Sequence, residues 1–302
     1  MLKNVLLIVN PGSGKGLAKE YALRLKEILE EHHASSVLIR HTKEMDDAYN
    51  WAKDSYKDGF DTVVTLGGDG TVNETVSGLM MIEDNRPCFS FLPLGTVNDL
   101  ARALNMPLSV KECIEAFVTV KRSMIDIGRI NQQYFINTVA VGSIAESVME
   151  TSSVDKNKIG RWAYFRDGIV AAFSEESYQL IILDSNNNRH ELETNLLLVG
   201  LTNSVGGFEK MNPGANVNDG YLHLTAVRGR NLLDLSIAMI EGKLLDLETD
   251  KLFSLRDTFF RIESSDNQSI SSNVDGDLGS NLPLEIEICH NALEVYVPHL
   301  EK

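Results

Sequence analysis

Short apolar runs alternate with amphipathic stretches over the first 125 residues of the 302-residue chain. The runs are rich in β-branched and aliphatic residues and end at Gly, Pro or Asn, which is typical of strands buried on both faces. The predicted strands are residues 5–9, 37–39, 62–66 and 89–92, and the predicted helices are residues 17–29, 46–56, 72–81 and 98–104. This alternation predicts an α/β N-terminal domain with a doubly wound, mostly parallel sheet.

The second part of the chain changes its period. Strand patterns separated by turns dominate, and only residues 161–174 and 232–245 have a helical pattern. The predicted strands are residues 124–130, 134–141, 178–183, 196–201, 221–227, 258–262, 284–288 and 293–297. These patterns predict a β-rich C-terminal domain, an antiparallel sandwich. We place the domain boundary after residue 125, so that residues 1–125 form the N-terminal domain and residues 126–302 the C-terminal domain.

The charge balance excludes some classes of function. Lys and Arg total 28 against 43 Asp and Glu, a net charge of −15, and residues 126–302 carry −12 of it. Nucleic-acid binding needs a basic surface, so we expect no nucleic-acid partner. With 43% hydrophobic residues the chain has ample material for a core and is not a disordered protein.

Targeting and cysteine patterns indicate a cytoplasmic protein. The N-terminal apolar run is too short for a signal peptide, and no apolar stretch approaches the ~20 residues that span a bilayer. Cys88, Cys113 and Cys289 are an odd number with no metal-binding spacing. We therefore expect all three to be reduced core residues.

A first glycine-rich loop, Asn10-Pro11-Gly12-Ser13-Gly14-Lys15-Gly16, lies between a predicted strand and a predicted helix. Small residues there expose backbone N–H groups, and a helix start adds partial positive charge, which together suit a phosphate group. The loop is not a Walker A motif, because Gly16 stands where Ser or Thr is required. The alternative is a flexible strand-to-helix turn with no ligand.

Two further loops follow the third and fourth predicted strands. The first, Gly67-Gly68-Asp69-Gly70-Thr71-Val72-Asn73-Glu74, allows close backbone approach, and Asp69 is placed to face a nucleotide-bound metal or hydroxyl. The second runs from Pro93-Leu94-Gly95-Thr96 to Asn98-Asp99. Both have a structural alternative, in which Thr71 caps one helix and Asn98 or Asp99 caps the next.

Together these loops resemble the catalytic domain of the diacylglycerol kinase family, which includes bacterial lipid kinases and sphingosine kinases. The resemblance continues along the chain, in the same order, through further short motifs. They are Ile125-Asp126-Ile127-Gly128, Tyr134-Phe135-Ile136-Asn137, Asn218-Asp219-Gly220-Tyr221-Leu222 and Val274-Asp275-Gly276-Asp277.

The resemblance implies a set of ATP contacts on the glycine loops. Phosphoryl transfer depends on positioning and charge neutralisation, to which backbone donors, Lys15 and a divalent ion would contribute. The alternative for Lys15 is a solvated lysine. The implied nucleotide-binding residues are Asn10, Pro11, Gly12, Ser13, Gly14, Lys15, Thr42, Gly68, Asp69, Gly70, Thr71, Val72, Asn73, Glu74 and Thr96.

The resemblance also implies a Mg²⁺ site and a catalytic base. Asp219 would hold a structural Mg²⁺ with the backbone carbonyls of Asn216 and Tyr221, and Asp126 would be linked to it through water. Without the resemblance, Asp219 is a turn residue and Asp126 a structural strand residue. Asp277 stands where family members usually carry the Glu that deprotonates the lipid hydroxyl.

The function expected from this resemblance is an ATP-dependent lipid kinase, with diacylglycerol converted to phosphatidic acid as the default reaction. An NAD kinase-like enzyme and a non-catalytic nucleotide or lipid sensor are the alternatives. The acceptor and the oligomeric state, including a homodimer, are left open. Similar proteins also imply that the last strand returns to the first domain.

We expect the protein to reach its lipid substrate at the membrane surface through reversible peripheral contact. Basic and aromatic residues that favour the headgroup region are Lys156, Lys158, Arg161, Trp162, Tyr164, Phe165 and Arg166. The alternative is an amphipathic helix that uses these aromatic residues in the core.

Overall fold

The computed structural model describes residues 2–142, 177–205, 208–209, 214–227 and 252–299. The helices predicted at 161–174 and 232–245, and the basic aromatic segment at 156–166, lie outside these residues. The chain divides into two compact units, one of Met1–Ile125 with Asn291–Lys302 and the other of Asp126–His290.

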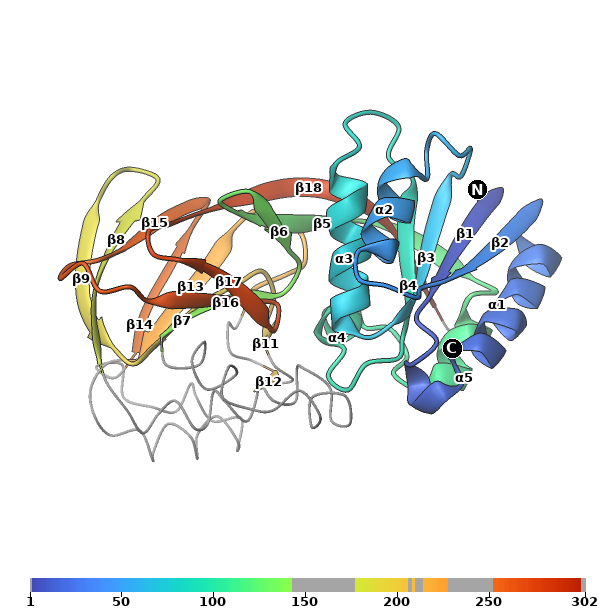
Figure 1. The fold of residues 1–302 in the computed structure, drawn as a ribbon, viewed down its shortest axis with the longest axis horizontal. Helices are drawn as coiled ribbons and strands as arrows, with labels where there is room; N and C mark the ends of the chain where they lie inside the picture. Colours follow the sequence, from blue (N-terminus) through green and yellow to red (C-terminus); the bar gives the residue numbers. More distant parts are fainter. Residues whose placement is uncertain (1, 143–176, 206–207, 210–213, 228–251, 300–302) are drawn as a thin grey trace. The chain divides into compact units, whose positions relative to one another are not determined.

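The first unit contains a parallel sheet in the order β2-β1-β3-β4 (Figure 1). Its strands are β1 (Asn4–Val9), β2 (Ser36–His41), β3 (Thr62–Gly67) and β4 (Cys88–Pro93), and the end of β18 (Leu284–Pro298) lies parallel to β4. Every residue of β3 and β4 is buried, as continuous apolar strands covered on both faces require. The predicted α/β fold with a mostly parallel sheet is confirmed.

Helices cover both faces of this sheet, with α2 packed against α3 and α1 against α5 (Figure 1). Their bounds are α1 (Ala18–His32), α2 (Asp47–Asp54), α3 (Asp69–Met80), α4 (Asp99–Ala103) and α5 (Val110–Ala116). The first four were predicted and α5 was not. Gly78 allows α2 and α3 to approach closely, because a Cβ there would lie 2.2 Å from the Tyr49 carbonyl oxygen.

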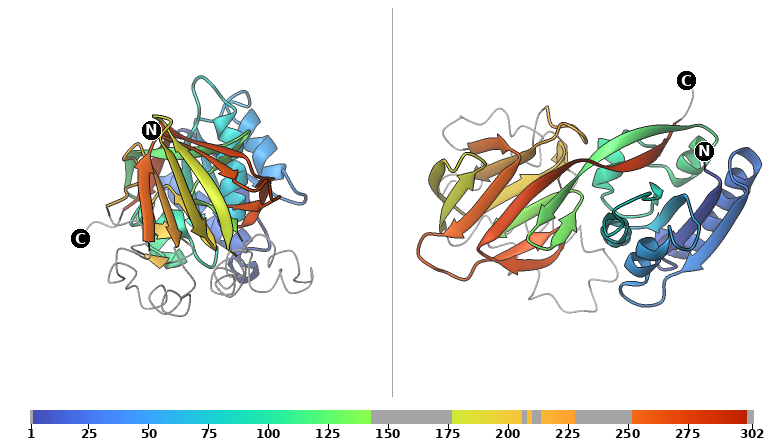
Figure 2. Two further views of the ribbon diagram at one scale, coloured as in Figure 1. Left: turned by 90° about the vertical axis from the view of Figure 1, so that its left-hand side faces the viewer. Right: turned by 90° about the horizontal axis from the view of Figure 1, so that it is seen from above.

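The second unit is a sandwich of two antiparallel sheets, and this confirms the predicted class (Figure 2). One sheet contains β5 (Val120–Ile130), β6 (Gln133–Phe135), β8 (Tyr178–Asp184), β9 (Arg189–Thr194), β15 (Phe259–Ser264) and β18. The other has the order β14 (Leu252–Asp257), β13 (Leu222–Val227), β10 (Leu196–Gly200), β7 (Thr138–Gly142), β16 (Ser271–Val274) and β17 (Asp277–Asn281). A small hairpin joins β11 (Ser204–Val205) and β12 (Phe208–Glu209).

The core of the second unit lies between its sheets. Phe135, Ile182 and Phe260 from one sheet and Val139 and Val199 from the other belong to one buried apolar cluster. In β8 the buried side chains of Leu180 and Ile182 alternate with less buried neighbours, as expected of a sheet that turns one face toward the core.

The strand predicted at residues 134–141 is wrong, because two strands in different sheets replace it. β6 ends at Phe135 and β7 begins at Thr138. The break is held by the buried Asp275 carboxylate, which accepts hydrogen bonds from the backbone N–H groups of Ile136, Asn137 and Thr138 at 2.7, 3.0 and 2.8 Å. A side chain distant in sequence thus turns the chain from one sheet to the other.

The opposite error occurs near the C-terminus, where the strands predicted at 284–288 and 293–297 form the single strand β18. The polar residues between them do not end it, and Asn291 is accommodated with φ 48°, in the left-handed region that Asn tolerates. Six other strands, β9, β11, β12, β14, β16 and β17, were not predicted.

The cysteine prediction holds for two residues and fails for the third. Cys88 and Cys113 are buried, whereas Cys289 is partly exposed and is not a core residue. Burial raises the pKa of the Cys88 and Cys113 thiols to about 12, so neither forms thiolate at neutral pH.

We therefore expect Cys289 alone to react rapidly with Ellman's reagent in the native protein at mildly alkaline pH. Cys88 and Cys113 should react only after denaturation. Absorbance at the thionitrobenzoate band measures both stages, and a Cys289→Ser variant identifies the fast thiol. Rapid loss of all three thiols in native buffer would contradict the burial of Cys88 and Cys113.

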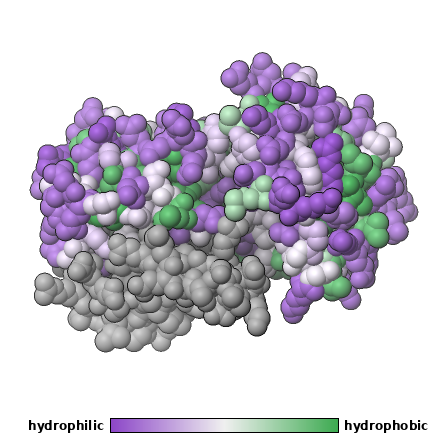
Figure 3. All heavy atoms as spheres, in the orientation of Figure 1, coloured by the Kyte–Doolittle hydropathy of each residue, from purple (hydrophilic) through white to green (hydrophobic). Residues whose placement is uncertain are grey.

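Within the described residues, no helix is both long and apolar enough to cross a membrane. The face shown in Figure 3 is largely hydrophilic over those residues, with smaller groups of apolar side chains.

Candidate functional site

In the first unit, the three glycine-containing loops follow the carboxyl ends of β1, β3 and β4. In the strand order β2-β1-β3-β4, the chain adds β2 on one side of β1 and then adds β3 and β4 on the other side. The order of the strands therefore reverses between β1 and β3. In open α/β sheets, ligands bind in the crevice at such a switch point. Loops 10–16 and 68–74 flank this position, and Thr42 follows β2 next to it, with its N–H donating to the Val9 carbonyl at 2.9 Å.

Asn10 joins the first two loops. Its Nδ2 donates to Thr71 Oγ1 at 3.2 Å, while its Oδ1 accepts from the Gly12 N–H at 3.0 Å. Thr71 does not cap the helix, because α3 already begins at Asp69 with Gly68 at the N-cap position and no side-chain cap. The structural alternative for Thr71 is therefore wrong.

Asp69 joins the second loop to the third. Its carboxylate is buried, and Oδ2 accepts from the Asn98 N–H at 3.3 Å. The Asn98 side chain makes no helix cap, and instead its Oδ1 accepts from the Gly95 N–H at 2.9 Å. Hence Asp69 faces the third loop rather than open solvent. Asn98 occupies the N-cap position of α4, but its side chain makes no capping hydrogen bond there, and Asp99 is already the first residue of the helix.

The first loop has a left-handed backbone over consecutive residues. Gly14, Lys15 and Gly16 have φ values of 61°, 57° and 84°. Glycine adopts this region freely, whereas Lys15 does so with strain of about 1 kcal/mol. Lys15 is exposed, and such backbone strain is often found where a chain contacts a ligand.

We expect Gly95→Ala to disrupt the junction of the second and third loops. The added Cβ would lie 2.8 Å from both Asp69 Oδ2 and Asn98 Oδ1, and 3.2 Å from Gly68 Cα. Moving these groups should raise KM for the nucleotide about 10-fold or more through misplacement of the loop.

Steady-state kinetics over a nucleotide titration measure this effect, and thermal unfolding shows whether the variant is folded. A folded variant with an unchanged KM would show that this junction does not position the nucleotide.

In the second unit, candidate residues gather at one edge of the sheet that contains β7. Gly200 of β10 is paired with both His223 of β13 and Thr138 of β7, and Val139 of β7 is paired with Val274 of β16. Consequently β10 and β16 end where β13 and β7 begin. The turn 216–221, Asn137 and the turn 275–277 all lie at this edge, and Asp219 and Asp275 are three strand spacings apart, about 14 Å.

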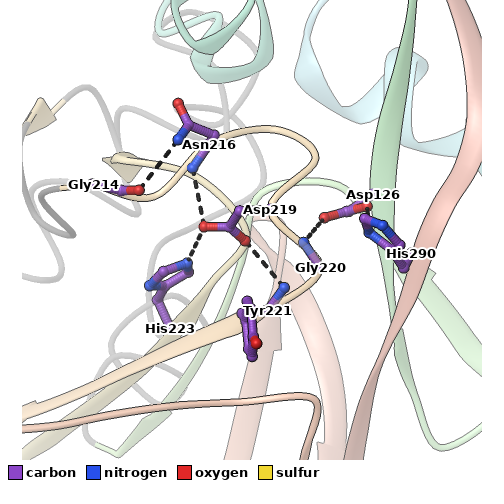
Figure 4. Close-up of polar contacts among 8 residues, drawn as sticks. All are labelled: Asp126, Gly214, Asn216, Asp219, Gly220, Tyr221, His223 and His290. Carbon is purple, nitrogen blue, oxygen red and sulfur yellow. Dashed lines mark hydrogen bonds and ion pairs between the residues drawn. The ribbon is translucent and has the colours of Figure 1, made fainter.

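Asp219 is held inside its turn (Figure 4). Oδ1 accepts from the Tyr221 N–H at 3.0 Å, and Oδ2 accepts from the Asn216 N–H at 3.3 Å and contacts His223 Nε2 at 2.9 Å. The side chains of Asp219 and His223 are only 11% and 12% exposed. Sequence reasoning missed His223, although its position in the strand directly after the turn was a usable signal.

Asp126 binds the same turn from β5 (Figure 4). Its N–H donates to the Val217 carbonyl and its Oδ2 accepts from the Gly220 N–H, both at 2.7 Å. The other carboxylate oxygen, Oδ1, lies 2.8 Å from Nδ1 of His290, another residue that sequence reasoning missed. Asp126 thus touches the backbone of the turn directly.

Asp277 is exposed at the start of β17, next to a tightly fixed turn. Asn273 Oδ1 accepts from the Gly276 N–H at 2.9 Å, and the Asp275 N–H donates to the Thr138 carbonyl at 2.9 Å. Asp275 and Gly276 have φ values of 48° and 86°. An exposed carboxylate on a rigid turn is suited to accept a proton from a substrate hydroxyl.

The donors of the turn 216–221 fit a hard cation. Asp219 and the carbonyls of Asn216 and Tyr221 are all oxygen ligands, which Mg²⁺ prefers. Among the described residues, Asp219 Oδ1 accepts one hydrogen bond, from the Tyr221 N–H, where it can take two. Over the described residues, no group of three or more His, Cys, Asp or Glu side chains is placed to hold a metal. A cation here would therefore rely on backbone carbonyls and water in addition to the Asp219 carboxylate.

Comparison with known proteins covers nearly the whole chain. Residues 4–130 match the family model described as the diacylglycerol kinase catalytic domain, and residues 138–297 match the YegS C-terminal NAD kinase beta sandwich-like domain. A protein named diacylglycerol kinase from Staphylococcus saprophyticus is 31% identical over 304 residues, covering 99% of this chain and 97% of that protein. One from Staphylococcus epidermidis is 32% identical, with 99% and 93% covered.

Solved structures agree with these matches. A crystal structure titled as a diacylglycerol kinase from Bacillus anthracis str. Sterne has a TM-score of 0.83 at 25% identity, and covers 98% of this chain and 97% of that one.

Proposed function

This chain belongs to the diacylglycerol kinase family, and on that premise we propose that it transfers the γ-phosphate of ATP to the free hydroxyl of diacylglycerol, forming phosphatidic acid. Membership makes the protein a lipid kinase, an enzyme that transfers phosphate to a hydroxyl group. ATP as the donor, Mg²⁺ as the metal and diacylglycerol as the acceptor belong to the proposal.

The observation that carries the nucleotide part is the joining of three loops at the switch point of the first unit. The Asn10–Thr71 and Asp69–Asn98 hydrogen bonds hold these loops together. The first-turn N–H groups of α3 follow Gly68, which provides no side-chain cap, and helix N-termini of this kind favour phosphate.

The nucleotide contacts are assigned to the loops and to the residue after β2. Lys15 would meet phosphate oxygens as a flexible point charge, and Thr42 would contribute from the end of β2. The full set is Asn10, Pro11, Gly12, Ser13, Gly14, Lys15, Thr42, Gly68, Asp69, Gly70, Thr71, Val72, Asn73, Glu74 and Thr96.

Mg²⁺ would be held by Asp219 and the carbonyls of Asn216 and Tyr221, with Asp126 supporting the turn. When bound, the ion supplies positive charge that keeps the carboxylate of the turn compatible with an anionic substrate. Asp126 orients the turn through Val217 and Gly220 in either case.

Asp277 is assigned the role of general base. Its carboxylate would accept the proton of the lipid hydroxyl while that oxygen attacks the γ-phosphorus, and the bond to the leaving phosphate oxygen breaks. Asp is one methylene shorter than the Glu usual in similar proteins, so the acceptor has to approach this turn more closely or through a water molecule.

A lipid acceptor also implies that the enzyme contacts the membrane in which the lipid lies. We place the enzyme in the cytoplasm, with reversible peripheral contact and no nucleic-acid partner. A net charge of −15 opposes broad attachment to anionic lipid, which favours a small, local docking surface.

Phosphotransfer from labelled ATP tests the proposal. The protein is incubated with Mg²⁺ and diacylglycerol in mixed micelles, and in parallel with a total lipid extract, and labelled products are identified chromatographically. We expect labelled phosphatidic acid with diacylglycerol. Labelling of a different lipid in the extract alone would retain the kinase and replace the acceptor.

A second candidate is an NAD kinase-like activity, because the matching model for the second unit is described as NAD kinase beta sandwich-like. NAD⁺ is therefore included as an acceptor, and phosphorylation of NAD⁺ without lipid would select this reading. Nucleotide binding with no turnover on any acceptor would favour the third possibility, a sensor whose base has been lost at Asp277.

A further inference from the structure

Asp126 and His290 form a pair at the two places where the chain passes between its units. Asp126 follows Ile125, the last residue of the first segment of unit 1, and His290 precedes Asn291, where that unit resumes. His290 Nδ1 lies 2.8 Å from Asp126 Oδ1, with side-chain exposures of 51% and 1%. The histidine is therefore at the surface, while the carboxylate it contacts is buried.

The same carboxylate controls the turn 216–221. Its second oxygen accepts from the Gly220 N–H, and the Asp126 N–H binds the Val217 carbonyl, so two hydrogen bonds of 2.7 Å fix both ends of the segment that contains Asp219 (Figure 4). Gly220 has φ 77°, and a Cβ on it would lie 3.0 Å from His290 Nδ1. The histidine ring thus packs directly on the turn as well as on Asp126.

The contact between His290 and Asp126 sets the orientation of the carboxylate. A buried carboxylate is stable only when its oxygens receive hydrogen bonds. Here His290 contacts Oδ1 and the Gly220 N–H donates to Oδ2. Removing the Nδ1 donor leaves Oδ1 without that hydrogen bond and favours rotation toward water. Such rotation would draw Oδ2 away from Gly220 and release one end of the turn.

We infer that His290 is a positioning residue for the cation site on the turn 216–221, acting through Asp126 and Gly220. The inference rests on the metal assignment within the proposed function. His290 does not supply a ligand; it fixes the backbone that presents Asp219 and the Tyr221 carbonyl. Partners of this kind, one step removed from the ligands, typically change metal affinity 10–100-fold.

Calorimetric titration of the full chain with Mg²⁺, in the absence of nucleotide and lipid, tests the inference. We expect His290→Ala to raise the Kd for Mg²⁺ about 10-fold or more. In the kinase assay, the Mg²⁺ concentration for half-maximal activity should rise similarly, while kcat at saturating Mg²⁺ changes by less than about threefold.

Two amide variants separate positioning from general loss of structure. Asn at 290 can place an N–H donor near the position of Nδ1, whereas Gln is one methylene longer and places its amide farther out. We expect His290→Asn to retain most of the Mg²⁺ affinity and His290→Gln to behave like alanine. Both remain informative if the alanine variant does not fold.

His190→Ala is the matched control. His190 Nε2 lies 3.5 Å from Asp184 Oδ2 beside the β8–β9 hairpin, so this variant removes a His–Asp contact of the same unit that does not touch the turn. Its Kd for Mg²⁺ should equal that of the wild type.

An unchanged Kd in His290→Ala, or equal weakening in the Asn and Gln variants, would overturn the inference. The inference would also be overturned if Asp219→Asn had the same Kd for Mg²⁺ as the wild type, because the cation would then bind elsewhere. Lipid phosphorylation is scored separately. If no lipid is phosphorylated but the His290 variants weaken Mg²⁺ binding as described, the proposed reaction fails and the positioning role stands.

Discussion

Replacing Asp277 by alanine is expected to lower kcat for lipid phosphorylation about 10³-fold, within the range that a general base contributes. Without the carboxylate, the attacking hydroxyl has no acceptor for its proton. Because Asp277 is exposed, its loss should leave the free energy of unfolding nearly unchanged. Initial rates with labelled ATP and diacylglycerol measure the first effect, and urea denaturation measures the second.

Two further variants at this position test the chemistry. Asp277→Asn keeps the shape and removes the base, so it should be as slow as alanine. Asp277→Glu restores the length usual in similar proteins and should match or exceed the wild-type rate. Asp266→Ala, at an exposed turn of the same unit, is the control for loss of an acidic surface residue. An alanine variant at 277 that retains the wild-type rate would show that the base lies elsewhere.

The second large effect is expected at Asp275, where replacement by alanine should destabilise the protein by about 3–5 kcal/mol. The carboxylate is buried and receives three backbone hydrogen bonds, from Ile136, Asn137 and Thr138. Alanine would leave these N–H groups buried with no carboxylate to accept them. Urea denaturation, analysed by linear extrapolation, measures the loss.

Asp275 and Asp277 are two residues apart, and their variants should differ in kind. Asp275→Ala is expected to lower both stability and activity, because the turn that carries Asp277 loses the side-chain hydrogen bonds that tie it to the β6–β7 corner. Asp277→Ala lowers activity alone. A variant of Asp275 with wild-type stability would mean that the corner is held by the strands on either side of it and not by this carboxylate.

Much of the fold follows from local patterns. The strands β1, β3 and β4 are continuous apolar runs that end at Gly, Pro or Asn, and a strand buried on both faces has no other simple pattern. The predictions fail where backbone pairing alone makes the strand. β17 (Asp277–Asn281) has almost no apolar residues, and it is a strand because β16 lies beside it.

The candidate site also contains residues that local sequence patterns reveal and residues that they do not. The glycine loops could be found from the sequence because their composition is unusual and each follows a recognisable strand. His290 could not be found, because it lies 164 residues from Asp126 and nothing around it in the sequence marks it. Asp275 was part of a motif, yet its contact with the corner at Ile136–Thr138 depends on the packing of β16 beside β7.

By itself, the sequence determined the class of each domain, the loops that follow the parallel strands and the residue types available for phosphate and metal. These follow from side-chain periodicity and backbone freedom, which are local properties. The tertiary structure decided which loops meet, where one apolar run becomes two strands, and which histidines hold the two aspartates at the turn 216–221. Those outcomes depend on hydrogen bonds between residues far apart in the chain, whose geometry exists only once the strands have paired.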